Sequence, residues 1–598
     1  MQRRTFWALT LCVLGLVLCG IGLLAVGTPV HAQEVVLEDI NLESAVYVGS
    51  RECALCHRPE LLDHRGTRHA VTLRDARVNA RVILADFTQG EEVRTIQFPD
   101  SEAPRPLEAA DIAYALGSGM NVQRYLYEVA PDEYMVLPAQ WNVNTGAWEA
   151  YGAADEWPHE SYAFGPNCAG CHTTDLDTSE FIWEENGVQC ETCHGPGSEH
   201  VEAVSDNAPP EIIRASIVMS PDPQICGQCH SQGIEPDTGL PYPSQYQPGV
   251  VNLLDENVFA LVPPDDEAHW WSTGHAEQKY MQFNESLLSA HATALTDMQE
   301  SEFADESCLQ CHSGDYRWTQ NLIALHEQGV RAEAPPEQVT LETASFGVTC
   351  ANCHEPHGDA GEASMLRGNA YLMCAECHAN PPEGDSIHYP AREMFEGVQL
   401  VADINASPSA HFTAEDGPRC ATCHMPTVPV VQAGTRDSHR WLPILPGTTE
   451  ELQDSCTTCH TDFVDVAGMQ QLVDGIRGNV QTRLDAANAA LTDEHPEWVG
   501  EALAFVENDG SEGIHNYAYA NTLLLRAESA LGINAQLEEP NLEPIADVSD
   551  LPDAQAASQP FTPESFGGGL TLPSIILLGI GGLIIATAVF FLFLRRPR

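Results

Sequence analysis

The pentapeptide Cys-x-x-Cys-His occurs nine times in this chain, and this repetition constrains the fold more than any other feature. In such a motif the two thiols attach a haem through covalent thioether bonds, and the adjacent imidazole becomes the proximal ligand of the iron. One copy of a five-residue pattern can arise by chance, whereas nine copies with histidine in the fifth position cannot. The sequence therefore predicts nine covalently attached haem c groups.

The motif residues divide into two sets. The predicted haem-attachment residues are Cys53, Cys56, Cys168, Cys171, Cys190, Cys193, Cys226, Cys229, Cys308, Cys311, Cys350, Cys353, Cys374, Cys377, Cys420, Cys423, Cys456 and Cys459. The predicted proximal iron ligands are His57, His172, His194, His230, His312, His354, His378, His424 and His460.

The cysteine count leaves little room for another use. Of the 20 cysteines, 18 lie in the motifs, and the remaining Cys12 and Cys19 lie in the N-terminal apolar segment. Zinc ribbons use two Cys-x-x-Cys pairs for each metal and need no histidine after each pair. Disulfides within the motifs would leave nine adjacent histidines unexplained. Haem attachment accounts for all three positions of the pattern.

An iron that only carries electrons needs a sixth ligand, and histidine gives a low potential while methionine raises it. Outside the motifs and His31, fourteen histidines remain, more than nine distal positions need. The predicted distal ligands are His69, His159, His200, His275, His291, His357, His411, His439 and His515. Four further histidines are weaker candidates, for which a surface or core role is favoured: His64, His269, His326 and His495.

Both ends of the chain carry apolar segments. Residues 1–32 resemble a signal peptide, with Arg3 and Arg4 before an apolar run, and an uncleaved N-terminal anchor is the alternative. Residues 575–594 contain no charge, are long enough to cross a bilayer and precede an arginine cluster. These features predict a cell-membrane protein with one C-terminal span, a cytoplasmic C-terminus and a haem domain on the periplasmic or extracellular side.

The chain is strongly acidic, with a formal net charge of −59 and a single lysine, Lys279. This charge argues against nucleic acid as a partner and for basic redox partner proteins. Solubility alone explains the charge equally well. A membrane subunit that oxidises quinol is a further expected partner, because residues 575–594 contain no ionisable side chain for a quinol site of their own.

Nine motifs between Cys53 and His460 leave too little polypeptide for a conventional core around each cofactor, so the haems must supply much of the interior. We predict a mainly α multihaem cytochrome c fold with long loops, a small β region near residues 90–150, a C-terminal helical segment and one C-terminal transmembrane helix. The predicted divisions are a signal peptide (1–32), a one-haem region with a small sheet (33–160), a three-haem region (161–300), a five-haem region (301–462), a helical tail packed on haems (463–532), a disordered acidic linker (533–566) and the membrane helix (575–594).

Several stretches resemble known multihaem cytochromes. The segment from Asn167 to His200 is similar to the family around the tetrahaem electron carrier of ammonia oxidisers. The last five motifs, with the sequence GIHN at 513–516 opening a helix, resemble the pentahaem module shared by cytochrome c nitrite reductase, hydroxylamine oxidoreductase and octahaem reductases. The resemblance covers residues 160–530; it is specific for the haem scaffold and loose on function.

The same resemblance bears on catalysis. Nitrite reductases bind their catalytic haem through Cys-x-x-Cys-Lys, whereas the corresponding motif here is CANCH at 350–354, and Lys279 lies near no motif in the sequence. The catalytic tyrosine and calcium-binding glutamate of that family have no counterpart after His378. His388 resembles the pocket histidine placed over the active haem, which makes it a candidate pocket residue over the Cys350 haem. A distal ligand or a propionate partner is the alternative role for His388.

Three functional interpretations follow. The first is electron transfer between respiratory partners along a chain of six-coordinate haems. The second is an oxidoreductase of the nitrite, hydroxylamine or tetrathionate type, which acts on a small nitrogen or sulfur species at a five-coordinate haem. The third is a haem-bearing filament subunit. We expect the electron carrier, and the sequence assigns no firm catalytic residue.

Overall fold

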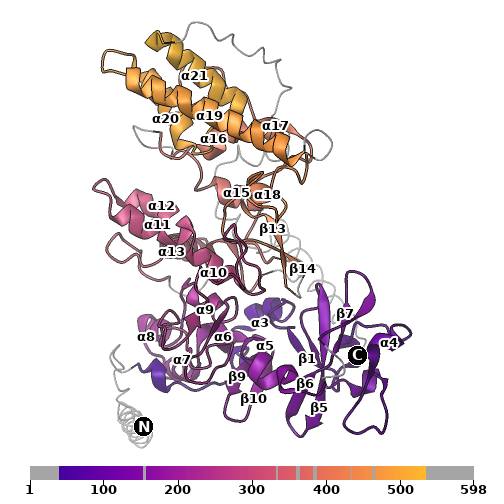
Figure 1. Ribbon diagram of the computed structural model, residues 1–598. Helices are drawn as coiled ribbons and strands as arrows, with labels where there is room; N and C mark the ends of the chain where they lie inside the picture. Colours follow the sequence, from indigo (N-terminus) through magenta and orange to yellow (C-terminus); the bar gives the residue numbers. More distant parts are fainter. Residues whose placement is uncertain are drawn as a thin grey trace, which may run out of the picture.

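The computed structural model describes residues 40–152, 157–330, 335–358, 364–381, 387–431, 434–460 and 465–533. The molecule is elongated, with a sheet and many short helices at one end and three long helices at the other (Figure 1). The predicted signal peptide, nearly all of the predicted acidic linker and the predicted membrane helix lie outside the described residues.

A six-stranded antiparallel sheet forms most of the N-terminal region. The central strand β5 pairs with β4, β6 and β7, and β1 and β8 lie at the two ends of the strand order. The strands are β1 (Leu73–Asp75), β4 (Tyr114–Leu116), β5 (Val122–Ala130), β6 (Glu133–Val136), β7 (Ala139–Asn142) and β8 (Ala147–Ala150). Aromatic residues are favoured in strands whose sheet has one buried face. Tyr125 of β5 and Phe98 are both fully buried.

Four further pairs of strands, all antiparallel, lie in the segments that connect the helices. They are β2 (Thr95–Ile96) with β3 (Arg105–Pro106), β9 (Thr173–Asp177) with β10 (Ile182–Asn186), β11 (Gly233–Ile234) with β12 (Ala260–Leu261), and β13 (Thr427–Val430) with β14 (Gly434–Asp437).

Eight of the nine motifs overlap a short helix, and the Cys456 motif lies in a turn. A helical turn explains this placement, because residues i, i+3 and i+4 lie on one side of a helix. The helices are α2 (Ser50–Cys53), α5 (Gly170–His172), α6 (Cys190–His194), α9 (Gln224–Gly227), α12 (Leu309–His312), α14 (Cys350–Cys353), α15 (Ala370–Ala375) and α18 (Cys420–His424). The two thiols and the imidazole of each motif can therefore face one cofactor.

Other helices connect the motifs and supply further histidines. They are α3 (Arg58–His64), α4 (Glu91–Arg94), α7 (Ser198–Ser205), α8 (Pro210–Ala215), α10 (Gln282–Leu287), α11 (Ala290–Gln299), α13 (Gly314–Glu327), α16 (Ala391–Glu396) and α17 (Ala410–Thr413).

The C-terminal end of the described chain is a bundle of α19 (Val466–Ala490), α20 (Glu497–Asn508) and α21 (Tyr517–Leu531). Leu503, Tyr519 and Leu523 lie in its buried core. The Asp465 side chain caps α19 by accepting a hydrogen bond from the Gly468 amide, and Gly532 ends α21 in a left-handed conformation. The same core also takes in Met394 and Val401 from the preceding region, and the haem-rich part of the chain has only smaller hydrophobic clusters, such as that of Leu253 and Phe283.

The predicted fold class is wrong in two respects. The sheet and the four strand pairs make the fold mixed α/β, because the connections between motifs pair as antiparallel strands and do not remain loops. Within the described ranges, no helix is both long and apolar enough to cross a membrane. The expected membrane helix at 575–594 falls outside those ranges, so the prediction of a single-span membrane protein loses its structural support.

Candidate cofactor-binding site

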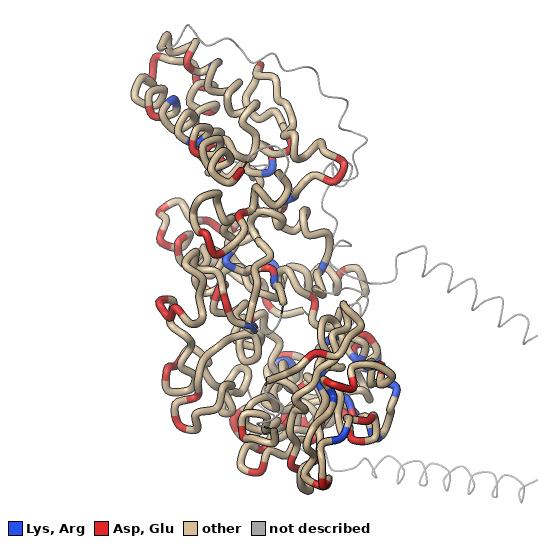
Figure 2. Tube along the Cα trace, turned by 45° about the vertical axis from the view of Figure 1, so that its right-hand side comes forward, with Lys and Arg blue, Asp and Glu red and all other residues tan. Residues whose placement is uncertain are grey.

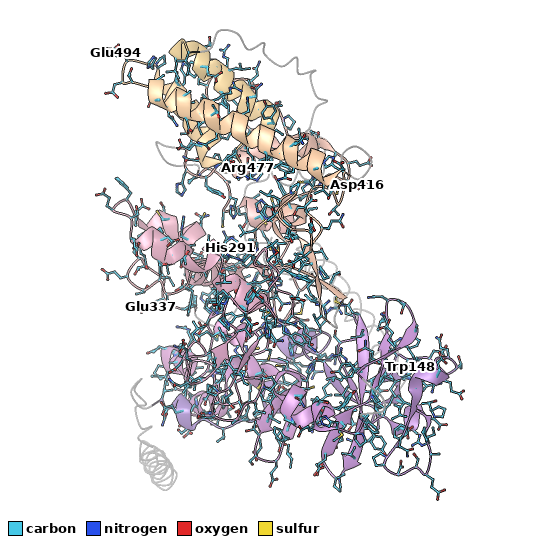
Figure 3. All side chains as sticks on the ribbon, in the orientation of Figure 1. Trp148, His291, Glu337, Asp416, Arg477 and Glu494 are labelled. Carbon is cyan, nitrogen blue, oxygen red and sulfur yellow. The ribbon has the colours of Figure 1, made fainter. Side chains whose placement is uncertain are left out.

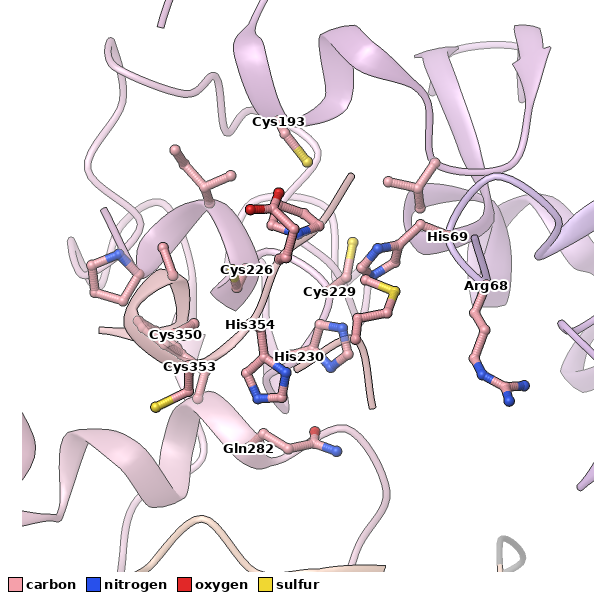
Figure 4. A pocket seen from close by; sticks show the side chains of 18 of the residues that line it. Arg68, His69, Cys193, Cys226, Cys229, His230, Gln282, Cys350, Cys353 and His354 are labelled. Carbon is pink, nitrogen blue, oxygen red and sulfur yellow. The ribbon is translucent and has the colours of Figure 1, made fainter. Parts of the chain in front are cut away.

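A large connected cavity of about 2920 Å³ runs through the haem-rich part of the chain. Cysteines or histidines from seven of the nine motifs line it. Figure 4 shows a part of this cavity, in which Cys226, Cys229 and His230 of one motif lie close to His69 and His354. Protein interiors are normally close-packed, so a cavity of this size with this lining fits covalently held haem groups that fill the interior.

The histidine rings of eight motifs each face a second histidine ring, with 5.9–6.2 Å between ring centres. A metal–imidazole bond is about 2 Å long and the ring centre lies roughly 1 Å beyond the bonded nitrogen, so one metal between two imidazoles separates their centres by about 6 Å. The pairs are His57 with His200, His194 with His357, His230 with His69, His312 with His388, His354 with His439, His378 with His291, His424 with His515 and His460 with His411.

The second ring nitrogen of many of these histidines is held by the protein. For example, Nδ1 of His194 donates to the Val218 carbonyl at 2.7 Å, and Nδ1 of His354 donates to the Ser364 carbonyl at 2.7 Å. Because a carbonyl can only accept, the proton lies on Nδ1 and Nε2 keeps its lone pair for a metal. The same arrangement holds for His200, His312, His424 and His439.

Burial keeps several of these imidazoles neutral. Loss of solvent lowers the pKa of His69, His172, His378 and His439 to about 4 each. A neutral imidazole is the form that binds a metal. These sites are therefore ready for ligation near pH 7 without a proton having to leave.

Seven of the nine predicted distal histidines face a motif histidine, and two do not. His159 is exposed, and its ring caps a short turn by accepting from the Ser161 amide. His275 is buried with both ring nitrogens used, by Thr273 and by the Leu442 carbonyl. Local sequence did not separate these two from the others, because the ring contacts that occupy them come from the fold.

His388 lies in a different place from the one predicted. It was expected over the Cys350 motif, but it faces His312 of the Cys308 motif with 6.2 Å between ring centres. The Cys350 motif already has a facing ring, since His354 lies 6.2 Å from His439. The alternative role considered for His388, that of a distal ligand, fits this geometry.

The Cys168 motif is the exception among the nine. Within the described part of the chain, no histidine ring faces His172 at the separation seen in the other eight motifs. The Nδ1 atom of His172 lies 2.6 Å from Thr72 Oγ1. The charges of Lys279 and Arg124 act on both Cys168 and His172. Lys279, which is distant from every motif in the sequence, thus lies beside this one in space.

Contacts between cysteines show which motifs are neighbours. The thiol groups of Cys53 and Cys190, Cys171 and Cys229, Cys226 and Cys350, Cys311 and Cys377, and Cys374 and Cys420 lie close enough to shift each other's pKa. Weaker electrostatic contacts join Cys193 with Cys229, Cys353 with Cys377 and Cys423 with Cys459. These eight contacts connect all nine motifs in one branched series.

The two ends of the longest path through this series are also its most exposed points. Cys56 in the first motif and Cys459 in the last are exposed, whereas the other motif cysteines are partly buried. Figure 1 shows α3, which directly follows the first motif, at the same end of the molecule as the sheet, and α18 below the long helices. The α18 motif is next to the Cys456 motif in the series. The series therefore runs through the interior and reaches the surface at both ends.

Two sequence families match parts of the chain. The family described as doubled CXXCH motif matches residues 344–382, and the family described as cytochrome c554 and c-prime matches residues 143–195. Each matched stretch contains two of the nine motifs. No curated protein matches the sequence.

Solved structures of multihaem cytochromes are similar to this chain over parts of its length. The outer cell wall cytochrome OcwA is 27% identical with a TM-score of 0.66, over 81% of this chain and 99% of that chain. An undecahaem cytochrome from the S-layer of Carboxydothermus ferrireducens is 20% identical with a TM-score of 0.49, over 83% of this chain and 70% of that chain. The cytochrome c nitrite reductase of Desulfovibrio desulfuricans is 15% identical with a TM-score of 0.27, over 42% of this chain and 73% of that chain. The predicted resemblance to multihaem cytochromes is thereby confirmed. OcwA, with its TM-score of 0.66, is the structure that supports the similarity in fold.

Proposed function

We propose that this chain is a multihaem c-type cytochrome whose nine motifs hold nine haems c that carry electrons between two sites on its surface. The protein supplies attachment, axial ligands and orientation, while the cofactors supply the redox chemistry. The observation that carries this proposal is the set of eight histidine pairs with ring centres about 6 Å apart. Iron with two imidazole ligands has no free position for a substrate and is suited to electron transfer at low potential.

The cysteine contacts support a specific route. The main path runs from the Cys53 motif through those of Cys190, Cys226, Cys350, Cys374 and Cys420 to that of Cys456. The Cys168 motif branches from Cys226, and the Cys308 motif branches from Cys374. Exposure of Cys56 and Cys459 supports electron entry and exit at the two ends of the main path.

We propose that the protein works outside the cytoplasm, in the cell wall. The name of the structurally similar OcwA, an outer cell wall cytochrome, supports this location. The partners we propose are basic redox proteins or cationic small acceptors, because acidic residues far outnumber basic ones and are spread along the chain (Figure 2). Fractionation of the native cells tests the location: the protein should be released with the wall, and recovery in the membrane fraction would contradict it.

Haem content is tested on the purified holoprotein. Intact mass and a pyridine haemochromogen assay should give nine haems and nine irons per chain, still attached after denaturation. Electron paramagnetic resonance should show that low-spin iron accounts for the great majority of the haems. Fewer than nine attached haems, or mainly high-spin iron, would contradict the proposal.

A second candidate function is the reduction of a small nitrogen or sulfur species. The absence of a facing imidazole at His172 within the described chain favours it, because such chemistry needs an axial position that a substrate can reach. Stopped-flow mixing of the reduced holoprotein with nitrite or hydroxylamine tests this candidate. Rapid, saturable reoxidation would support it, and reoxidation no faster than that of a bis-histidine cytochrome would count against it.

A further inference from the structure

The Cys168 motif combines an ordinary attachment site with an unusual surrounding. His172 is partly buried and its Nδ1 lies 2.6 Å from Thr72 Oγ1. When Nδ1 donates to that hydroxyl, Nε2 keeps its lone pair and can bind iron. The described chain offers no histidine for the opposite side. What the chain places beside this motif is instead a pair of cations.

Arg124 on β5 and Lys279 in the segment before α10 both line the cavity next to this motif. Their charges act on Cys168 and on each other. Arg124 donates through Nε to Gln140 Oε1 at 2.9 Å and lies 4.2 Å above the Tyr151 ring. Among the described residues, neither cation forms a salt bridge with a carboxylate.

The segment that carries Lys279 is held in a strained conformation. The next residue, Tyr280, has a φ of 61°, which is uncommon for a residue with a side chain. The Lys279 ammonium lies 5.5 Å from the centre of the Tyr280 ring, and Tyr280 in turn interacts electrostatically with Arg124 and Cys171. Strain of this kind persists where the surrounding structure requires it, and it is concentrated at ligand sites.

The two cations lie together without a carboxylate partner among the described residues. The chain carries 86 acidic residues against 27 basic ones, yet no carboxylate of the described chain pairs with Arg124 or Lys279. A partly buried charge without a counter-charge is costly. A small anion bound between the two side chains would remove that cost.

We propose that Arg124 and Lys279 form a binding site for a small inorganic anion with a lone-pair donor atom, at the axial position opposite His172. The inference rests on the proposed haem content, because the anion would bind the iron that His172 holds. The site takes an anion because both charged groups are cations. It takes a small one because the tyrosines Tyr151 and Tyr280 flank the cations.

The test uses the holoprotein with azide and nitrite as probes. The resting protein should show one high-spin haem, and its signal should move to low spin as azide or nitrite is added. The variants Lys279→Gln and Arg124→Gln should each weaken azide binding about tenfold or more, because each removes a charged hydrogen-bond donor. Carbon monoxide, which is neutral, should bind the reduced variants as it binds the parent. Arg477→Gln, on the helical tail, is the matched control and should leave azide affinity unchanged.

Two results would overturn the inference. Unchanged azide affinity in both variants would show that the cations do not bind the anion. A fully low-spin resting protein that gains one high-spin haem in Lys279→Gln would show that Lys279 is itself the sixth ligand. Either result leaves the electron-transfer proposal intact, whereas high-spin iron at most of the nine haems would overturn that proposal.

Discussion

At the scale of single residues, the function depends on which nitrogen of each histidine is free. Backbone carbonyls such as those of Val218 and Ser364 fix the proton on Nδ1 and turn Nε2 toward the cavity. His275 shows the opposite case, because both of its nitrogens are bound by the protein. Hydrogen bonding to the second nitrogen therefore distinguishes a ligand from an ordinary buried histidine.

His388 provides a sharp residue-scale prediction. Replacing it with alanine should remove the ring that faces His312 and convert one haem from low to high spin. Quantitative electron paramagnetic resonance measures this change. His159→Ala is the control, because His159 is exposed and faces no motif histidine, and it should leave the spectrum unchanged. An unchanged low-spin count in His388→Ala would refute the pairing and return His388 to the role of a pocket residue.

A second residue-scale prediction concerns potential. Replacing His200, which faces His57, with methionine should raise the potential of one haem, because a thioether ligand favours the reduced iron. Redox titration followed at the haem absorption bands should show one component shifted upward and the remainder in place. A titration curve that coincides with that of the parent would contradict the assignment.

At the scale of elements, short helices carry the motifs and long helices carry the stability of the tail. Figure 3 shows Trp148 on the sheet and Arg477 on the helical tail at opposite ends of the molecule, with His291 between them. The tail is tied together by Arg483 of α19 and Glu528 of α21, whose side chains are 9% and 3% exposed and 2.8 Å apart. This buried pair joins the first and last helices of the bundle.

Breaking that pair should destabilise the tail. Glu528→Gln leaves Arg483 buried without its counter-charge, which costs roughly 3 kcal/mol or more. Denaturant unfolding followed by far-ultraviolet circular dichroism measures the loss. The matched control is Glu512→Gln, which breaks the more exposed pair with Arg477 at 2.6 Å and should cost about 1 kcal/mol or less. Equal effects of the two variants would show that burial does not decide the contribution of the Arg483 pair.

At the scale of the whole molecule, the acidic surface and the path between exposed ends act together. In the proposed function, the net charge of −59 would attract cationic reactants, and Cys56 and Cys459 would be the points at which the haem path is reached from solvent. The other motif cysteines are only partly buried, so the proposal places electron exchange at the two most exposed motifs.

Salt should therefore slow reaction with cations. Reduction of hexaammineruthenium(III) by the reduced holoprotein should slow by roughly tenfold or more between low and high ionic strength, since screening shortens the range of attraction. An anionic oxidant such as ferricyanide should react faster as salt is added. Stopped-flow kinetics at several salt concentrations measure both rates. Rates that do not depend on salt would show that the surface charge does not steer electron partners.

Much of the site could be predicted because its chemistry is local. The spacing of two cysteines and a histidine within one helical turn specifies haem attachment wherever it occurs, and it does so in the Cys53 motif as in the Cys420 motif. The helix that ends at Leu531 and its glycine cap could also be predicted, because capping is decided by neighbouring residues. The extent of β structure could not be predicted, since pairing such as that of Leu126 with Tyr114 depends on which strands meet.

The sequence by itself determined the cofactor chemistry of this protein, since covalent attachment depends on residues within one turn of the chain. The tertiary structure alone decided which histidine faces which. His388 faces His312 and His69 faces His230 because loops from separate motifs cross in space, and no local pattern records that crossing. The same long-range folding placed Lys279 and Arg124 near the Cys168 motif, whereas a second imidazole faces the histidine of each of the other eight motifs.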